Sequence, residues 1–205
     1  MIELQKSDSL WTVRLNRPDK ANALTAEMLE KIYEIAKNAH SARGFILTAR
    51  GTVFSAGADL NAVEAGLATS DVWERVSGAI AELPGLTIAA LNGTLAGGAF
   101  GMALACDLRL AVPTTKFFYP VMALGYLPQP SDPHRLSALI GPARTKMILM
   151  TGRKLTADDA LTYGLIDQIC APETLMETAL TLCENSRWAS PEHALAIKQM
   201  CTQSS

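Results

Sequence analysis

The sequence predicts a single domain of the α/β class, in which strands alternate with helices. Polar and apolar residues alternate over Leu10–Leu15, which is the pattern of a half-buried strand. A continuous apolar run over Thr87–Leu91 indicates a strand that is buried on both faces. Between them, the residues after Thr25 place their apolar side chains at helical spacing. These three patterns together favour a sheet that is covered by helices.

Length and composition agree with one globular domain. The chain has 205 residues, of which 49% are hydrophobic and 19% are charged. This length suits one sizeable core, and the apolar fraction excludes a disordered chain. The 18 basic and 20 acidic residues give a net charge of −2. Without a basic surface, the protein is expected to bind neither nucleic acid nor an anionic membrane.

The N-terminal half is predicted to contain four strands and four helical segments. The turn residues Ser7–Ser9 separate the first two strands. Thr25 is a typical helix N-cap, because its hydroxyl can accept a hydrogen bond from a free backbone N–H. We expect strands at Ile2–Leu4, Leu10–Leu15, Phe45–Thr48 and Thr87–Leu91, and helical segments at Thr25–Ala39, Ala62–Ala68, Val72–Leu83 and Ala96–Cys106.

The C-terminal half becomes mainly helical after Pro133. Thr156, with Asp159 three residues later, predicts a capped helix start. We expect strands at Leu108–Val112, Phe117–Phe118 and Gln168–Cys170, and helices at Leu136–Ile140, Ala143–Met150, Ala157–Tyr163, Leu175–Arg187 and Pro191–Cys201.

Two further features bear on compartment and cofactors. The uncharged stretch Leu83–Cys106 is long enough to span a bilayer, but Pro84-Gly85 and Asn92-Gly93 interrupt it as turns, so it is not predicted to be a membrane segment. The four cysteines form no C-x-x-C pair and show no metal-ligand spacing. We therefore expect reduced thiols packed as small apolar groups, no metal site, no cofactor and a cytoplasmic protein.

Two segments of very small residues follow predicted strands, at 54–60 and at 92–98. Where a strand gives way to a helix, backbone N–H groups lack partners within the helix. Two such groups that converge on one oxygen form an oxyanion hole. The alternative is that glycine and alanine merely allow close packing of helix and sheet. The dinucleotide, Walker and serine hydrolase glycine motifs do not occur in the chain.

Four motifs in order resemble one family along nearly the whole chain. They are Asn16–Leu24, Phe54–Leu60, Asn92–Asp107 with its Ala96-Gly97-Gly98 turn, and the later pair Leu124-Gly125 and Ala160–Asp167. They are similar to the crotonase (enoyl-CoA hydratase/isomerase) superfamily. The resemblance implies a spiral of ββα units with two roughly perpendicular sheets. It implies a spiral core over 1–187 and a shortened C-terminal helical segment over 188–205. With this segment shortened, either a neighbouring subunit covers the acyl pocket or the pocket is more open than usual in the family.

The resemblance also implies a set of site residues. The backbone N–H groups of Ala58 and Gly98 would hold the thioester oxygen of an acyl-CoA. Coenzyme A would enter only as part of the substrate. The expected substrate-binding residues are Lys20, Ala21, Ala56, Gly57, Asp59, Leu60, Gly97, Val121 and Tyr126.

The usual acid and base positions of the family carry no carboxylate in this chain. Hydratases use two glutamates, whose positions hold Gly101 and Val121; a later isomerase position holds Gln129. Gln129 is nevertheless the expected catalytic side chain, because the sequence of Tyr119–Gln129 most resembles that of the Δ3,Δ2-enoyl-CoA isomerases. Alternative groups nearby are Glu64, Tyr126, Asp132 and His134; Asp132 is expected to be a helix N-cap and His134 to be exposed.

These residues predict an acyl-CoA-processing enzyme that stabilises a thioester enolate and is a poor hydratase, with isomerase chemistry favoured. The alternatives are a catalytically silent acyl-CoA-binding homologue and a decarboxylase-like member, which needs few acids. The resemblance implies a homotrimer or a dimer of trimers.

Overall fold

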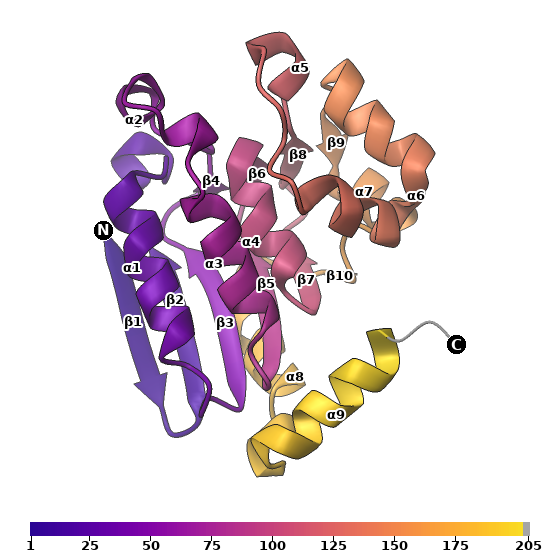
Figure 1. Cartoon of the computed structure of the whole chain (residues 1–205). Helices are drawn as coiled ribbons and strands as arrows, with labels where there is room; N and C mark the ends of the chain where they lie inside the picture. Colours follow the sequence, from indigo (N-terminus) through magenta and orange to yellow (C-terminus); the bar gives the residue numbers. More distant parts are fainter. Residues whose placement is uncertain (203–205) are drawn as a thin grey trace.

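The computed structural model describes residues 1–202, which form two sheets wrapped by helices (Figure 1). The large sheet has six strands in the order β1-β2-β3-β5-β7-β10, and the small sheet has four in the order β4-β6-β8-β9. The large sheet contains β1 (Ile2–Ser7), β2 (Leu10–Leu15), β3 (Gly44–Ala49), β5 (Leu86–Leu91), β7 (Leu108–Ala111) and β10 (Gln168–Ile169). The small sheet contains β4 (Val53–Ser55), β6 (Thr94–Ala96), β8 (Lys116–Phe118) and β9 (Leu155–Thr156).

The same succession of elements occurs three times. A strand of the large sheet leads to a strand of the small sheet and then to helices, first through β3 and β4, then through β5 and β6, and then through β7 and β8. The α-helices are α1 (Ala26–Lys37), α2 (Leu60–Glu64), α3 (Val72–Ala81), α4 (Phe100–Ala105), α5 (Val121–Leu124), α6 (Asp132–Thr151), α7 (Ala157–Tyr163), α8 (Leu175–Leu182) and α9 (Pro191–Thr202). Short 3-10 turns are η1 (Pro18–Lys20), η2 (Leu67–Thr69), η3 (Gly97–Ala99) and η4 (Asn185–Trp188).

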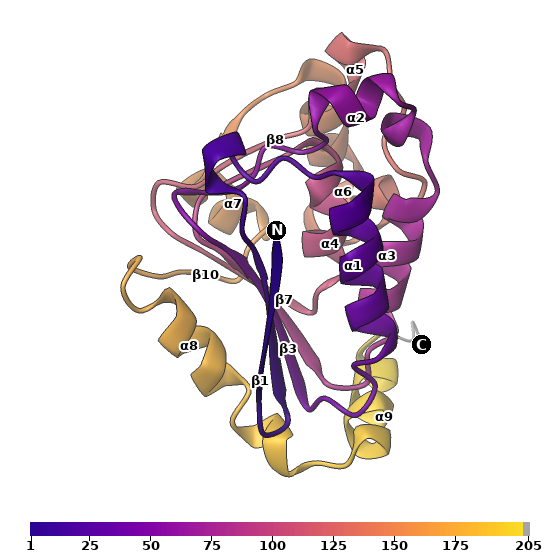
Figure 2. The ribbon, with the colours of Figure 1, turned by 90° about the vertical axis from the view of Figure 1, so that its left-hand side faces the viewer.

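Both faces of the large sheet are covered, as the apolar run in its central strands predicts. Seen along its edge, the sheet has α1, α3 and α4 on one side and α8 on the other (Figure 2). Neighbouring residues of β3 serve both sides, because Phe45 and Leu47 join the first core whereas Ile46 joins the second. The second core contains Leu175 and Ala179 of α8.

The α/β class is confirmed, and so are the two predicted helix caps. The Thr25 hydroxyl accepts a hydrogen bond from the Met28 N–H at the start of α1. Thr156 and Asp159 form a reciprocal capping box at the start of α7.

Several predicted boundaries were wrong. The short strands β4, β6 and β9 and the helix α5 were not predicted. The two helices expected on either side of residue 141, by contrast, are both present: they lie within the range of α6 and are separated where Gly141 leaves the helical conformation, with φ 79° and ψ 161°. The helix expected over Leu175–Arg187 ends at Leu182 and is followed by η4.

Three cysteines are buried as expected, whereas Cys201 is exposed. Within residues 1–202, no helix has both the length and the apolar character that crossing a membrane requires. The same residues contain no cluster of three potential metal ligands.

Candidate active site

The two segments of small residues meet at one edge of the small sheet. Strands β4 and β6 are parallel neighbours, so the segments that follow their carboxyl ends lie side by side. Gly57 has φ 94°, and a Cβ atom at this position would lie 3.0 Å from the carbonyl oxygen of Ala96. This close approach requires glycine, because a side chain at position 57 would push the two segments apart.

The N–H of Ala58 is directed by a single β-bridge to Leu24. The Gly57 carbonyl accepts from the Leu24 N–H at 2.8 Å, and the Asp59 N–H donates to the Leu24 carbonyl at 2.9 Å. Because successive peptide groups of an extended segment point to opposite sides, the Ala58 N–H points away from Leu24. It is therefore available to the side on which the second segment lies.

The second segment begins a helix. Gly97 adopts φ 55° and starts η3, which runs directly into α4. The N–H groups of the first turn, that of Gly98 among them, have no carbonyl partner earlier in the helix. Above Gly98 lies the indole of Trp73, which is 3.2 Å from the place that a Cβ atom would take. The Trp73 Nε1 donates to the Leu67 carbonyl at 2.8 Å, so the ring is held in position.

The loop between β2 and α1 fixes the first segment from behind. Asn22 is fully buried, and its amide donates to the carbonyls of Arg50 at 2.8 Å and Val53 at 2.7 Å. The Ala21 carbonyl accepts from the Ala56 N–H at 3.0 Å. Ala21 and Asn22 both have positive φ, near 50°, a conformation that these hydrogen bonds hold in place.

Three of the predicted substrate-binding residues, Lys20, Ala21 and Asp59, do not line the pocket beside these segments. The Asp59 carboxylate caps α2 and accepts from Arg17 Nη1 at 2.6 Å, and this ion pair lowers the pKa of the carboxyl. Asp59 therefore positions the loop and does not line the pocket, since its two oxygens are already engaged. Lys20 is exposed on η1 and does not line the pocket either.

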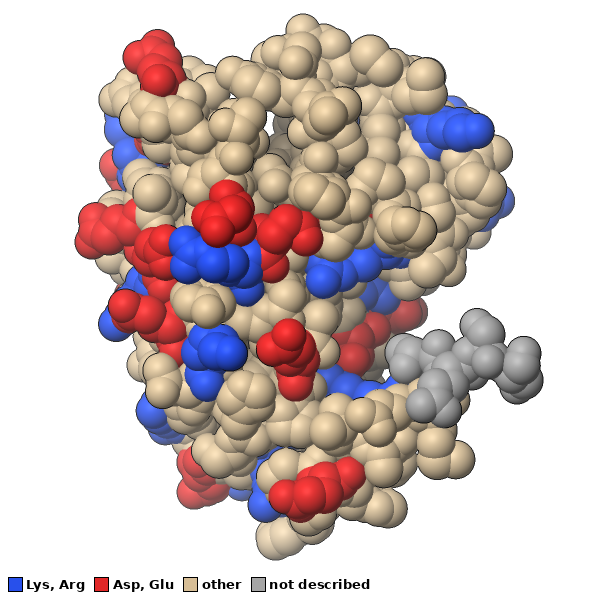
Figure 3. Space-filling view, viewed as in Figure 1, with Lys and Arg blue, Asp and Glu red and all other residues tan. Residues whose placement is uncertain are grey.

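A pocket of about 390 Å³ opens beside the two segments. The molecular surface is hollowed between α2 and α5, at the level of this pocket (Figure 3). Most of the predicted site residues line it, namely Ala56, Gly57, Ala58, Leu60, Gly97, Gly98, Val121, Tyr126 and Gln129. None of the described lining residues is an aspartate, a glutamate, a lysine, an arginine or a histidine. The pocket therefore offers backbone N–H groups and apolar walls at its surface.

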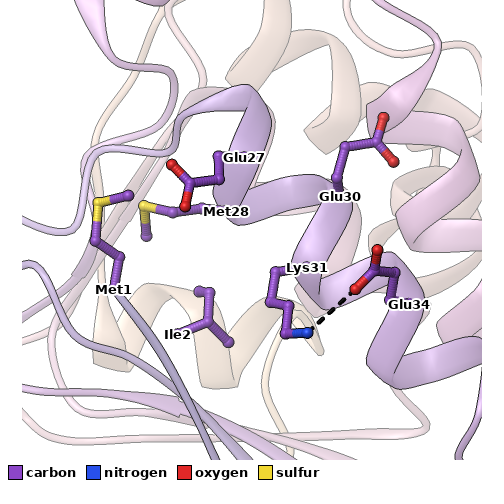
Figure 4. A pocket seen from close by; sticks show the side chains of 7 residues that line it. All are labelled: Met1, Ile2, Glu27, Met28, Glu30, Lys31 and Glu34. Carbon is purple, nitrogen blue, oxygen red and sulfur yellow. Dashed lines mark hydrogen bonds and ion pairs between the residues drawn. The ribbon is translucent and has the colours of Figure 1, made fainter.

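A second depression, of about 540 Å³, lies elsewhere, between the N-terminus and α1 (Figure 4). The side chains around it include Glu27, Glu30 and Glu34, with Lys31 bound to Glu34 at 3.1 Å. It contains neither of the small-residue segments. Its size alone does not make it the candidate site, because it offers no arrangement of converging backbone donors.

The three positions that lack a carboxylate differ in their surroundings. Gly101 is buried in α4, Val121 is half-buried at the start of α5, and the Gln129 side-chain amide donates to the Ala68 carbonyl at 3.4 Å. Val121 and Gln129 line the pocket. A Cβ atom added to Gly101 would lie 3.0 Å from Oδ1 of Asp132.

The expectation that Asp132 caps a helix was wrong. Ser131 occupies the N-cap position of α6, and Asp132 is its fully buried first residue. Burial raises the pKa of the Asp132 carboxyl to about 7, an effect opposed by the hydrogen bond from Tyr119 and reinforced by Glu74. His134, by contrast, is exposed as expected.

Sequence reasoning missed two residues of this region, Trp73 and Tyr119, and named Asp132 only as an alternative group that was expected to cap a helix. Trp73 and Tyr119 line the pocket and Asp132 lies behind Tyr119. Tyr119 directly precedes Pro120, which belongs to a matched motif, so its position in the sequence could have indicated a site residue. Trp73 lies on α3 and Asp132 on α6, and only the tertiary structure shows that these helices approach the pocket.

Two parallel strands that each end in a donor segment, above an apolar pocket, define an α/β protein of the crotonase fold. A family model described as enoyl-CoA hydratase/isomerase matches residues 5–205. The chain belongs to the enoyl-CoA hydratase/isomerase family.

Individual relatives agree with this assignment. The chain is 33% identical over 202 residues to the "Probable enoyl-CoA hydratase echA6" of Mycobacterium leprae, covering 96% of this chain and 78% of the relative. It is 30% identical over 206 residues to a trans-2-decenoyl-(acyl-carrier-protein) isomerase of Streptococcus mutans, covering 95% and 78%. The solved structure of an enoyl-CoA hydratase from Bacillus anthracis superimposes with a TM-score of 0.91 at 28% identity, covering 98% of this chain and 82% of that one. The crotonase fold that the motifs implied is thereby confirmed.

Proposed function

We propose that the protein binds an acyl-CoA thioester in the pocket beside β4 and β6 and stabilises its enolate. The convergence of the Ala58 and Gly98 segments beside an uncharged pocket is the observation that carries this proposal. A thioester oxygen between the two N–H groups would gain two hydrogen bonds that strengthen as negative charge develops on it. We place the CoA portion beside Ala21, whose carbonyl accepts from the N–H of the pocket residue Ala56.

We further propose that the reaction is a proton shift, such as the Δ3 to Δ2 isomerisation, and that hydration is poor. Hydration requires a base to activate water and an acid to protonate carbon. Gly101 and Val121 supply neither, and the pocket surface has no carboxylate among its described residues. An isomerisation moves one proton between two carbons and requires a single group. The S. mutans relative, whose name is that of an isomerase, is consistent with this reaction.

Calorimetry and a crystal soak with acetoacetyl-CoA test the binding mode. We expect saturable binding, with the thioester oxygen within hydrogen-bond distance of the Ala58 and Gly98 nitrogens. Ligand bound elsewhere, or no binding, would refute the proposal. Assays with crotonyl-CoA, a Δ3-enoyl-CoA and a malonyl-type thioester then separate hydratase, isomerase and decarboxylase, and binding without any turnover would identify a silent acyl-CoA-binding homologue.

We also propose that the chain assembles as a homotrimer or a dimer of trimers. Exposed apolar side chains gather on and after α5, namely Met122, Leu124 and Leu127, and such patches mark contact surfaces. Light scattering coupled to size exclusion measures the mass directly, and a monomer at micromolar concentration would contradict the assembly.

A further inference from the structure

Asp132 is a buried carboxyl group with one oxygen uncommitted. The residue is fully buried, and its Oδ1 has no hydrogen-bond partner among residues 1–202. That oxygen lies 3.0 Å from the place of a Cβ atom on Gly101. A buried, unpaired carboxylate oxygen is costly, and proteins retain such groups mainly where they have a role. The absent side chain of Gly101 leaves the space that Asp132 occupies.

Tyr119 connects this carboxyl to the pocket. Its hydroxyl lies 2.9 Å from Oδ2 of Asp132, and it accepts from the Gln129 N–H at 3.4 Å. Since the Gln129 N–H can only donate, the Tyr119 proton is directed to Asp132. The ring is stacked on Phe100 with centroids 5.3 Å apart, and it lines the pocket beside Gly98. Tyr119 is thus held rigidly between the carboxyl and the pocket.

The charged groups around Asp132 are few. Glu74 of α3 faces the start of α6, where its carboxylate accepts from the Ser131 N–H and hydroxyl at 3.0 Å each. Arg135 of α6 donates to the Ser131 hydroxyl at 2.8 Å. Glu74 raises and Arg135 lowers the pKa of Asp132, while burial, the largest effect, raises it. The carboxyl can therefore change its protonation near neutral pH.

We propose that Tyr119 and Asp132 form the proton-transfer pair of the acyl pocket, with the Tyr119 hydroxyl facing the substrate and Asp132 acting through it. This assignment rests on the proposed function. Asp132 is a positioning and proton-accepting partner in it, and the pair takes the place of the missing glutamates at Gly101 and Val121.

The proton balance of the step is as follows. The Tyr119 oxygen takes a proton from C2 of the acyl group while its own proton passes to Oδ2 of Asp132. The electron pair of the broken C–H bond forms the enolate, whose charge the Ala58 and Gly98 N–H groups stabilise. The reverse transfer returns a proton to C2 or delivers it to C4, and Asp132 is again a carboxylate.

Deuterium exchange tests the pair without assuming the overall reaction. Butyryl-CoA is incubated with the protein in D₂O, and loss of the C2 hydrogens is followed by NMR. We expect exchange with the parent protein, with a rate that rises with pH through about 7 as Asp132 loses its proton. Asp132→Asn and Tyr119→Phe should each slow it by about 10²–10⁴-fold, typical of a lost acid/base group. The double variant should be no slower than either single variant, because the two groups act as one unit.

Two controls make the outcomes distinct. His134→Gln removes an exposed titratable group two residues from Asp132 and should leave the rate and the pH profile unchanged. Acetoacetyl-CoA affinity and melting temperature are measured for every variant, and Tyr119→Phe retains the stacked ring if Asp132→Asn fails to fold. A parent protein that binds no acyl-CoA would refute the proposed function. A parent that binds but does not exchange, or folded variants that exchange at the parent rate, would overturn the pair alone.

Discussion

Replacing Gly98 by proline removes the N–H that we assign to the thioester oxygen. Gly98 lies in the first turn of η3 and its φ is not positive, so proline there removes no hydrogen bond within the helix. The substitution also adds a Cβ atom 3.2 Å from the Trp73 ring. Gly98→Ala adds the same atom but keeps the N–H, so it is the matched control.

The expected loss of transition-state stabilisation is that of one of the two backbone N–H donors. One oxyanion donor contributes about 2.7–4 kcal/mol in the transition state, which is about 10²–10³ in rate. The ground-state thioester carries less charge, so free CoA and saturated acyl-CoA should bind to Gly98→Pro almost as they bind to Gly98→Ala. An enolate-forming analogue such as acetoacetyl-CoA should bind about 10²-fold more weakly to the proline variant, again by comparison with alanine.

The assay is calorimetric titration of both variants with acetoacetyl-CoA and free CoA, together with the C2 exchange rate in D₂O. Thermal unfolding shows whether α4 remains intact, since a displaced helix would mimic the loss of the donor. Equal analogue affinity in a stably folded Gly98→Pro and in Gly98→Ala would refute the oxyanion assignment. Gly98 would then serve only the close packing against Trp73.

Three further outcomes are expected. The parent protein should hydrate crotonyl-CoA poorly, and rates like those of ordinary hydratases would contradict the account of Gly101 and Val121. Gln129→Glu places a carboxylate on the pocket wall and should raise Δ3,Δ2-isomerase activity; a folded, ligand-binding variant without gain would argue against this position. Burial raises the pKa of Asp132 from 3.8 to about 7, so the folded state binds more protons between these values and the free energy of unfolding falls as pH rises through them. Between pH 5 and pH 8 the fall covers about two pKa units, which is at most about 3 kcal/mol, and Asp132→Asn should abolish it in urea unfolding at these two pH values.

The sequence was most informative where structure is decided locally. The Thr25 cap and the Thr156–Asp159 capping box involve residues three apart, and both were predicted correctly. The long strands of the large sheet have enough residues to show either the alternation of Leu10–Leu15 or the continuous apolar run of Thr87–Leu91. The strands β4, β6 and β9 have two or three residues each, too few for a period. They form because of their neighbours in the small sheet: β4 and β6 pair in parallel with each other, and β9 pairs antiparallel with β8.

In the candidate site, too, features decided by local sequence were predictable and features decided by tertiary neighbours were not. Small residues after two predicted strands indicated two segments of interest, and the structure brings these segments side by side at one edge of the small sheet. Asp59 belongs to a matched motif, yet its carboxylate is taken up by Arg17 and the start of α2. Asp132 has the local context of an N-cap, and nothing in its neighbours along the chain indicates that α4 leaves a space for it beside Gly101.

Gly101 and Asp132 are therefore coupled. A side chain on Gly101 would bring its Cβ to 3.0 Å from Oδ1 of Asp132, so it would compete for space with the Asp132 carboxyl, which would have to shift to make room for it. In the proposed mechanism the carboxyl group is on α6, whereas the family's glutamate position at Gly101 is on α4. The Asp132 carboxyl also lies farther from the substrate than a glutamate on the pocket wall would, because Tyr119 stands between them. A group that reaches the pocket through a single hydroxyl can carry one proton to and from carbon, but it cannot also activate a water molecule. Under this proposal, the geometry of the pair favours proton shifts over hydration.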